Sequence, residues 1–392
     1  MDTYDLVSKH PLLAILRNVP LEKTIDYAEA AVQGGAPFFE VALNSPHALE
    51  QITMLRPHFG DRCTVGAGTA ITVERCKAAL DAGAQFLLTP GTPLDVFSYC
   101  AENDIALLPG VLTPTDVATS LQFGYKTMKL LAAGEELTEL TIDEILHKYR
   151  SAQDKFLTES FGTIAAYGTN AAMMHYHATE EDHAKLEKKG FLLVDSGATY
   201  MDGTTDITRT YPLGELTEDE RLFYTWTLQC HIDIARAVWL DYCDGHMLDT
   251  IAREPLWRHL INYRCGTGHS VSFVGNVHEG PHALNGRNTT LMRPGMIVTD
   301  EPGVYEAGEV GIRIENEIEC YHKADNQYGT FLAFRPLTFV PIATSPIVPG
   351  VLDKEQVAWL NDYHRKVFEQ LAPRLTEDER DWLAKKCAAI GA

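Results

Sequence analysis

The chain has 392 residues, which is long enough for two or three domains with apolar cores of their own. Its 33 basic and 54 acidic residues give a net charge of −21, which argues against binding to nucleic acid or to an anionic membrane surface. The eight cysteines form no CxxC pair and no apolar stretch approaches about eighteen residues, so we expect a cytoplasmic protein with reduced thiols and no membrane span.

The first third of the chain alternates short apolar runs with helical patterns at a period of roughly twenty residues, as in βα units of a parallel sheet. Residues 21–35, for example, repeat their apolar positions at helical spacing and end at glycine. We predict six strands, in the runs PLLAILR (11–17), FFEVALN (38–44), CTVGAGT (63–69), QFLLTPG (85–91), ALLPGVL (106–112) and TMKLLAA (127–133).

In this order the runs resemble the class I aldolases of 2-keto-3-deoxy-6-phosphosugar acids, which act on phosphogluconate and phosphogalactonate derivatives. The resemblance covers nearly all of residues 10–131. It implies a (β/α) barrel in which Lys129 forms a Schiff base and Glu40 moves protons, with Arg17 and Thr69 in the substrate site. A complete barrel has eight strands and a glycine-rich phosphate cradle. We therefore expect an incomplete six-strand barrel-like segment and favour loss of the lyase activity.

After Gly134 the sequence passes into a helix pattern, LTELTIDEILHKYRSAQ, without a linker rich in Pro, Ser or Gly. Independent domains are usually joined through exposed polar linkers. The abrupt join favours a fusion or a chimeric gene. We expect an aldolase-like segment at residues 1–134 and a second domain at residues 135–392.

A β-hairpin is predicted in FLLVDSGATYMDGTTDITRT (191–210), with Asp202-Gly203 as its turn. The period of two places Asp195 and Asp206 on one face. That turn leaves the two carboxylates four residues out of step, roughly 13 Å along the strand at about 3.3 Å per residue. A bend or bulge must close this gap if both carboxylates bind one ligand. The alternative is that both are solvated residues at a strand edge.

Three further potential ligands follow on separate segments, namely His269, Glu301 and Glu315. The segment GIRIENEIEC reads as a period-two strand whose carboxylates face away from its isoleucines. We interpret its later acids, Glu317 and Glu319, as a solvated face. An oxygen-rich set with one imidazole suits manganese, cobalt or zinc in a two-metal hydrolase.

Several long motifs in this part resemble the catalytic domain of the Xaa-Pro aminopeptidases, which are metallopeptidases of the pita-bread fold. The motifs are YGTNAAMMHYHAT, LLVDSGATYMDGTTDITRT, GTGH, NVHEGP, VTDEPGVYE and GIRIEN. The match runs from about residue 137 to the end. In that family a long opening helix and a further N-terminal domain precede the catalytic domain, and we expect both to be missing here.

The resemblance implies that two divalent ions bind to Asp195, Asp206, His269, Glu301 and Glu315, with Asp206 and Glu315 bridging them. It also implies roles for four catalytic residues. Glu301 would handle the proton of the attacking hydroxide, His175 and His278 would contact the peptide and stabilise the tetrahedral intermediate, and Arg313 would support the ligands. His177 lacks such a context and is interpreted as surface. Cys265 stands where the family often has another active-site histidine.

The predicted function is therefore a metal-dependent aminopeptidase that removes the residue before a penultimate proline. Manganese is the expected metal, with zinc or cobalt as alternatives, and small peptides are the expected partners. Two other hypotheses remain: a keto-acid lyase working through Lys129, and an inactive chimera of the two pieces. The preferred first residue and a homodimer are left open.

Overall fold

The computed structural model divides into two compact units, unit 1 from Met1 to Val111 and unit 2 from Leu112 to Ala392. It describes residues 13–70, 72–89, 96, 99–100, 102–103, 105–109, 114–153 and 155–391. No helix within these ranges is long and apolar enough to cross a membrane.

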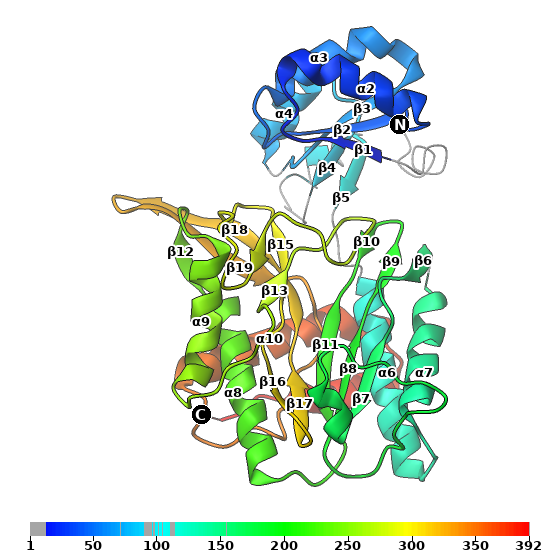
Figure 1. Ribbon diagram of the computed structural model, residues 1–392, viewed down its shortest axis with the longest axis vertical. Coiled ribbons are helices and arrows are strands. Elements are labelled where there is room, and N and C mark those ends of the chain that lie inside the picture. The colour runs from blue at the N-terminus through cyan, green and yellow to red at the C-terminus, as the bar shows by residue number, and fades with distance from the viewer. Residues whose placement is uncertain are drawn as a thin grey trace. The chain divides into compact units, whose positions relative to one another are not determined.

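Unit 1 is built on a parallel sheet whose strands neighbour one another in chain order, β1-β2-β3-β4-β5. The strands are β1 (Leu13–Leu16), β2 (Phe38–Ala42), β3 (Thr64–Gly68), β4 (Leu87–Thr89) and β5 (Leu107–Pro109). The helices α2 (Thr24–Gln33), α3 (Ala48–Phe59) and α4 (Val73–Asp81) lie against one face of this sheet (Figure 1), with the short turns η1 (Leu21–Lys23) and η2 (Gly60–Arg62) between elements. Phe39, Ile52 and Val65 are fully buried between the helices and the sheet. Five of the six predicted strands are thus confirmed.

The sixth predicted strand is wrong, because residues 127–133 belong to the helix α6 (Pro114–Ala133) of unit 2. Phe123, Thr127 and Leu131 recur every four residues and are buried, whereas Lys126 and Lys129 are exposed. That is the period of a helix. A short apolar run by itself does not distinguish a strand from part of a buried helix.

The same helix bears on two further expectations. It runs directly before α7 (Glu139–Ser151), so unit 2 does not lack an opening helix. The compact units also divide at Val111, not at residue 134, because α6 packs with unit 2. The predicted helix after Gly134 is confirmed as α7. Its N-cap is Thr138, whose hydroxyl accepts a hydrogen bond from the Thr141 backbone N–H.

Unit 2 consists of small antiparallel sheets flanked by helices (Figure 1). Its strands are β6 (Phe156–Glu159), β7 (Ile164–Tyr167), β8 (Phe191–Ser196), β9 (Ala198–Tyr200), β10 (Gly203–Thr204), β11 (Ile207–Pro212), β12 (Val238–Leu240), β13 (Gly268–His269), β14 (Ala283–Leu284), β15 (Ile297–Asp300), β16 (Gly303–Glu306), β17 (Val310–Arg313), β18 (Asn316–Asn326) and β19 (Gly329–Pro336). Its other helices are η3 (Gly168–Ala172), α8 (Glu218–Ala235), α9 (Gly245–Trp257), α10 (Lys354–Leu371), η4 (Ala372–Arg374) and α11 (Glu377–Lys386).

Two sheets of unit 2 are each covered by a pair of helices. The helices α6 and α7 pack on the sheet β11-β8-β7 through a buried cluster that includes Phe123, Leu146 and Val194. The helices α8 and α9 pack on the sheet β12-β19-β18-β15 through a cluster that includes Leu248 and Ile318. The apolar side chains therefore point outward to the helices, which leaves the opposite faces of both sheets for polar residues.

Candidate metal centre

The hairpin that carries Asp195 and Asp206 turns one residue earlier than expected. Met201 and Asp202 form the turn, so that Tyr200 pairs with Gly203. In this register Thr208 is opposite Asp195. Since Asp206 precedes Thr208 by two residues, it lies on the same face as Asp195 and two residues out of step, about 7 Å along the strand. The shared face is confirmed, and the predicted offset of four residues is wrong.

Gly197 interrupts the hairpin beside the two aspartates. The strand β8 ends at Ser196, and β11 begins at Ile207, so the ladder breaks around Gly197 and Asp206 and its two parts lie in different sheets. A Cβ atom on Gly197 would lie 1.8 Å from the Thr205 carbonyl oxygen, a distance that only glycine allows. The ladder is thus interrupted between the two carboxylates, while the register is the same on both sides of the interruption.

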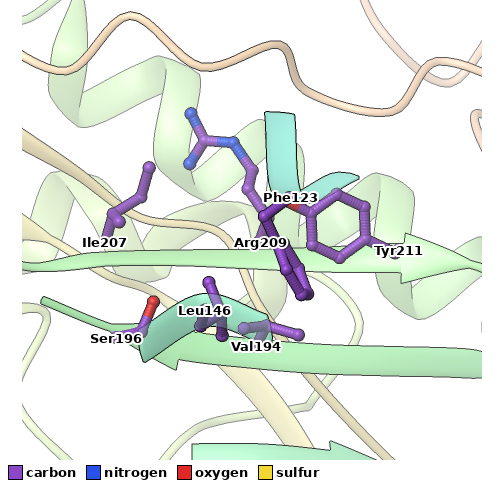
Figure 2. A pocket seen from close by; sticks show the side chains of 7 residues that line it. All are labelled: Phe123, Leu146, Val194, Ser196, Ile207, Arg209 and Tyr211. Carbon is purple, nitrogen blue, oxygen red and sulfur yellow. The ribbon is translucent and has the colours of Figure 1, made fainter. Parts of the chain in front are cut away.

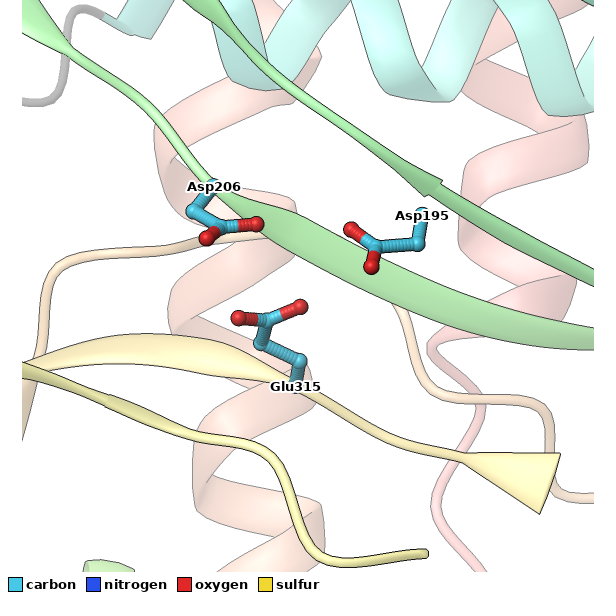
Figure 3. Close-up of side chains that lie close together, drawn as sticks. All are labelled: Asp195, Asp206 and Glu315. Carbon is cyan, nitrogen blue, oxygen red and sulfur yellow. The ribbon is translucent and has the colours of Figure 1, made fainter. Parts of the chain in front are cut away.

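Three buried carboxylates converge at this interruption of the ladder. Asp195, Asp206 and Glu315 each offer an oxygen atom, and these oxygens all lie within 4.8 Å of one another. Figure 3 shows Asp206 and Asp195 side by side along the hairpin, with Glu315 reaching toward both from the facing chain. Glu315 stands between β17 and β18, where the predicted single strand is broken into two strands of different sheets.

His269 and Glu301 complete the group that the sequence predicted. His269 Nε2 lies 3.4 Å from Asp206 Oδ2 and 3.3 Å from Glu301 Oε1. Gly268 allows this approach, because a Cβ atom there would lie 1.8 Å from the Thr299 carbonyl oxygen. The Glu301 backbone N–H donates to the Thr267 carbonyl oxygen at 2.7 Å, which ties the two segments together. The structure therefore brings all five predicted ligands to one place.

The protonation of these acids reflects crowding of negative charge in a buried space. Burial raises the pKa of Asp206 well above its ordinary value, and the neighbouring charge of Asp195 raises it further. Burial likewise raises the pKa of Glu315, with Asp206 as the next cause, and the pKa of Glu301. Such a cluster is stable in its ionised form only when cations neutralise it.

The donor atoms fit divalent cations. Within the described ranges, Asp195 Oδ1 and Glu315 Oε1 are buried and have no hydrogen-bond partner. Buried polar atoms without a partner are costly, and the binding of an ion is one of their ordinary explanations. Carboxylate oxygens with one imidazole nitrogen suit manganese, zinc or cobalt better than soft thiophilic ions. The set therefore has the chemistry of a metal centre.

Arg313 is a buried cation at the edge of this cluster. Its guanidinium donates to Asp195 Oδ2 at 2.6 Å, to Thr208 Oγ1 at 3.0 Å and to the Tyr305 hydroxyl at 2.7 Å. Its charge lowers the pKa values of Asp206 and Glu301, against the larger effect of burial. Arg313 thus favours the ionised carboxylates and orients one of them.

The two histidines predicted to contact the peptide lie on exposed segments beside the carboxylates. The ring of His278 meets the ring of His269 edge-on, with centroids 4.0 Å apart. The pKa of His278 is lowered, first by the partial burial of its ring and then by the charges of His269 and His175. His278 is therefore neutral at neutral pH. His175 lies close enough to His278 for its charge to lower the pKa of His278. His177 is exposed, as expected.

The interpretation of Glu317 and Glu319 as solvated is wrong, since both side chains are buried. Glu317 Oε1 accepts a hydrogen bond of 2.8 Å from the Asp206 backbone N–H, and Glu319 Oε2 accepts one of 2.8 Å from Arg335 Nε. The period-two alternation predicted which face of the strand carries Glu317 and Glu319, but it did not predict that other segments cover this face. Glu317 thereby holds the backbone of a candidate ligand.

Two threonines near the ligands were missed by the sequence reasoning. Thr208 Oγ1 donates to Glu315 Oε2 at 2.5 Å, and Thr299 Oγ1 donates to Glu301 Oε1 at 2.9 Å. Thr208 comes two residues after Asp206 and Thr299 two residues before Glu301, so the period of two could have placed both on the ligand faces.

Cys265 is partly buried, and burial raises the pKa of its thiol to about 11, so it is protonated at neutral pH.

The aldolase-like residues are divided between the two units. Glu40, Arg17 and Thr69 belong to unit 1, whereas Lys129 lies on α6 of unit 2. Glu40 is buried, which raises its pKa to about 7. Lys129 is exposed, with Nζ 3.4 Å from the Tyr125 hydroxyl. The structure therefore places no lysine at the end of a strand in the described part of the unit 1 sheet.

A small cavity of about 10 Å³ lies between α6, α7 and the strands β8 and β11 (Figure 2). It is lined by Phe123, Leu146, Val194, Ser196, Ile207, Arg209 and Tyr211. That volume holds at most about one water molecule. None of the candidate ligands lines it, so it is a packing defect beneath α6 and no part of the metal centre.

Two helix-covered sheets that meet at an acidic centre define the pita-bread fold. Residues 120–321 match the family described as metallopeptidase family M24, and residues 330–390 match the C-terminal region of peptidase M24. The first match covers more than half of the chain, which therefore belongs to the metallopeptidase family M24. Residues 4–151 match the family of KDPG and KHG aldolases, so residues 120–151 are matched by both families.

Known relatives of the chain are aminopeptidases. It is 40% identical over 268 residues to a probable Xaa-Pro aminopeptidase P of Coprinopsis cinerea, across 66% of this chain and 43% of that protein. It is 42% identical over 253 residues to aminopeptidase P2 of Arabidopsis thaliana, across 63% of this chain and 36% of that protein. The chain thus spans less than half the length of these relatives.

Among solved structures, the chain resembles the X-prolyl aminopeptidase of Caenorhabditis elegans, described as a cytosolic enzyme with a di-nuclear active site. The TM-score is 0.69 at 31% identity, over 94% of this chain and 57% of that one. It also resembles the X-Pro aminopeptidase of Thermotoga maritima, with a TM-score of 0.50 at 19% identity over 87% and 98% of the chains. The second likeness supports the fold alone.

Proposed function

We propose that the chain is a metal-dependent aminopeptidase that releases the N-terminal residue from peptides whose second residue is proline. The observation that carries this proposal is the convergence of Asp195, Asp206 and Glu315, with oxygens within 4.8 Å of one another and two of those carboxylates holding unpartnered oxygens. The specificity for proline rests on the relatives, which are named for Xaa-Pro or X-prolyl substrates.

Five residues would hold two divalent ions: Asp195, Asp206, His269, Glu301 and Glu315. Manganese is the preferred metal, and zinc or cobalt would suit the same donor atoms. Bound ions of this kind supply Lewis acidity, which lowers the pKa of water and polarises a peptide carbonyl. A cytoplasmic location is part of the proposal, supported by the description of the Caenorhabditis elegans neighbour as cytosolic.

The protein's own groups would position the peptide and move the proton. Glu301 is suited to accept a proton from the nucleophile, because its carboxylate lies within the group of candidate ligands, with Oε1 3.3 Å from His269 Nε2. His278, neutral at neutral pH, and His175 would donate hydrogen bonds to the carbonyl oxygen as negative charge develops on it. Arg313 would hold Asp195 in its orientation.

We further propose that unit 1 is a fragment of a (β/α) barrel without lyase activity, and that the functional boundary lies before α6. Five parallel strands in chain order, with helices on one face, support the barrel fragment. The position of Lys129 on an exposed helical face argues against the lyase, because a Schiff-base lysine needs a pocket at a barrel strand end.

The test combines metal content with peptide cleavage. Protein stripped with a chelator and reloaded with manganese should bind two ions and cleave Xaa-Pro peptides but not matched Xaa-Ala peptides. The variant Asp206→Asn should lose this activity. Asp202→Asn, on the same hairpin but paired with Lys155 at 2.9 Å, is the matched control and should retain it. Protein that binds two ions and leaves Xaa-Pro peptides intact would reject the activity and keep the metal centre.

A further inference from the structure

The candidate ligands Glu301 and Glu315 leave the same strand pair from adjacent positions. The strands β15 and β18 are antiparallel, and Asp300 is opposite Asn316 at the end of their register. Glu301 follows Asp300 along the chain, and Glu315 precedes Asn316. Whatever fixes the distance between Asp300 and Asn316 therefore fixes the separation of the two ligands' backbones.

A histidine from a different element spans this pair. His231 lies on α8 and is fully buried. Its Nδ1 lies 3.1 Å from Asp300 Oδ2 and 3.3 Å from the Asp300 carbonyl oxygen. Its Nε2 lies 3.3 Å from Asn316 Nδ2. One imidazole ring thus contacts both strands at the point where the ligands begin.

The contacts of Arg209 determine which group donates and which accepts in the hydrogen bond between Asn316 and His231. Arg209 Nη2 donates to Asn316 Oδ1 at 2.8 Å, and the Tyr363 hydroxyl donates to the same oxygen at 3.2 Å. A guanidinium can only donate, so the Asn316 amide must present its oxygen to Arg209 and its N–H group to His231.

The orientation of that amide fixes the tautomer of the imidazole. His231 Nε2 must accept the hydrogen bond from Asn316, so the single proton of the neutral ring is on Nδ1. Nδ1–H then points at the carbonyl and carboxylate oxygens of Asp300. Arg209 also donates to the carbonyl oxygen of Glu315 itself, so the same chain of contacts reaches the ligand.

We propose that His231 is a positioning residue that holds Glu301 and Glu315 at the spacing needed to share two ions; this inference rests on the proposed function. A buried side chain that contacts both strands removes their freedom to separate when the site is empty. Ligands held in place before the ions arrive bind them more tightly, because less ordering accompanies binding.

The test measures ion binding by calorimetry in the full-length protein. In His231→Asn the amide can still donate toward Asp300 but offers no acceptor at the Nε2 position, and in His231→Leu both contacts are lost. We expect both variants to bind the ions more weakly, up to about 10- to 100-fold, with the larger loss in His231→Leu. If His231→Leu fails to fold, His231→Asn still decides the question.

A buried histidine whose hydrogen bond goes to another segment provides the control for a merely structural effect. His364 on α10 is also fully buried, and its Nε2 accepts a hydrogen bond from the Ile342 backbone N–H at 3.1 Å. His364→Asn should lower the melting temperature and leave the affinity for the ions unchanged. Variants of His231 that melt lower but bind both ions as tightly as wild type would overturn the inference.

Two further outcomes keep this inference separate from the proposed function. Wild-type protein that binds no divalent ion would overturn the metal centre and the inference with it, whereas unchanged affinity in the His231 variants would overturn the inference alone. Nitrogen NMR of histidine-labelled protein gives an independent check, because His231 should show a protonated Nδ1 and an unprotonated Nε2. The opposite tautomer would contradict the hydrogen bond from Asn316 Nδ2 to His231 Nε2.

Discussion

Arg313 donates a hydrogen bond of 2.6 Å to Asp195 Oδ2, and the two side chains are buried together at the edge of the carboxylate cluster. A lysine in place of Arg313 would keep the charge but could not reach Asp195, Thr208 and Tyr305 at once. We expect Arg313→Lys to weaken ion binding by about 10- to 100-fold, measured by calorimetry.

The control for this substitution is Arg335→Lys. Arg335 pairs with the buried Glu319 at 2.8 Å, on the strands β18 and β19, whose pairing continues away from the ligands. The substitution Arg335→Lys should therefore leave ion binding unchanged. Arg313→Met should in addition move the pH midpoint of ion binding upward, because the charge of Arg313 lowers the pKa values of Asp206 and Glu301. Equal affinity and an equal midpoint would contradict the role of Arg313.

The metal-free protein should lose stability as the pH rises. Burial raises the pKa values of Asp206, Glu301 and Glu315 in the folded state, whereas carboxyl groups of an unfolded chain titrate near pH 4. The folded state therefore binds protons more tightly than the unfolded chain. The resulting contribution to the free energy of unfolding is fully present below about pH 4, and it disappears as the pH rises through the raised pKa values of the three acids. Urea unfolding in the presence of a chelator, followed between pH 5 and 8, measures it.

Tryptophan fluorescence suits this measurement, because all five tryptophans lie in unit 2: Trp226, Trp239, Trp257, Trp359 and Trp382. Saturating manganese should stabilise the protein more at higher pH, since ions and protons compete for the same oxygens. Asp206→Asn removes one titrating group and should flatten the slope of the metal-free protein. A metal-free protein that gains stability from pH 5 to 8 would count against the charged, buried centre.

Gly124 offers a direct test of the helix α6. It lies inside the helix, and an added Cβ atom would meet Trp382 and Tyr211 at 3.5 Å, which is ordinary contact. Gly124→Ala should therefore stabilise unit 2 by roughly 0.5–1 kcal/mol, measured by urea unfolding. Gly134→Ala is the matched control, because Gly134 has a φ of 83° just after the helix and alanine there is strained. Destabilisation by Gly124→Ala would argue against a helix at residues 114–133.

The position of α6 also predicts where the chain can be shortened. A chain that begins at residue 112 keeps α6, whereas one that begins at residue 135 loses the buried Phe123 and Leu131. Burial of two such side chains contributes about 3–6 kcal/mol, a large part of the stability of an ordinary domain. We expect residues 112–392 to unfold cooperatively and residues 135–392 to be much less stable or insoluble. Equal stability of the two would show that α6 is dispensable.

Lys129 should form no Schiff base. It is exposed on α6, so it lacks the desolvated pocket that activates a lysine amine. Incubation with pyruvate and borohydride, followed by peptide mass spectrometry, should leave Lys129 unmodified. A reduced pyruvate adduct on Lys129 would revive the lyase hypothesis.

Local patterns in the sequence predicted helices and strands better than they predicted the burial of side chains or the register of strand pairing. The strands of unit 1 were predicted because each apolar run is short and bounded by glycine, proline or a helix. Residues 127–133 were misassigned because the decisive evidence, burial of Phe123 four residues before Thr127, lies outside the run. The hairpin register was missed because the turns Met201-Asp202 and Asp202-Gly203 differ by one residue, and the alternation of side chains fits both; the structure pairs Tyr200 with Gly203.

The candidate centre was predicted through resemblance and not through periodicity. Asp195 and Asp206 share a hairpin face, but His269, Glu301 and Glu315 come from distant segments whose convergence no local period reveals. The contacts that hold those segments, such as Glu317 to the Asp206 N–H, were invisible for the same reason. A buried carboxylate and a solvated one have the same sequence pattern until the covering segments are known.

The helix α6 has a consequence for protein engineering. Its residues 120–133 fall within the matches to both families, yet the helix packs through Phe123 and Leu131 onto the sheet of unit 2. We expect this position of the fold to depend more on an apolar stripe of that spacing than on the identity of the exposed residues. Libraries randomised on the exposed face of α6, with its buried residues held constant, would therefore test new N-terminal fusions of unit 2.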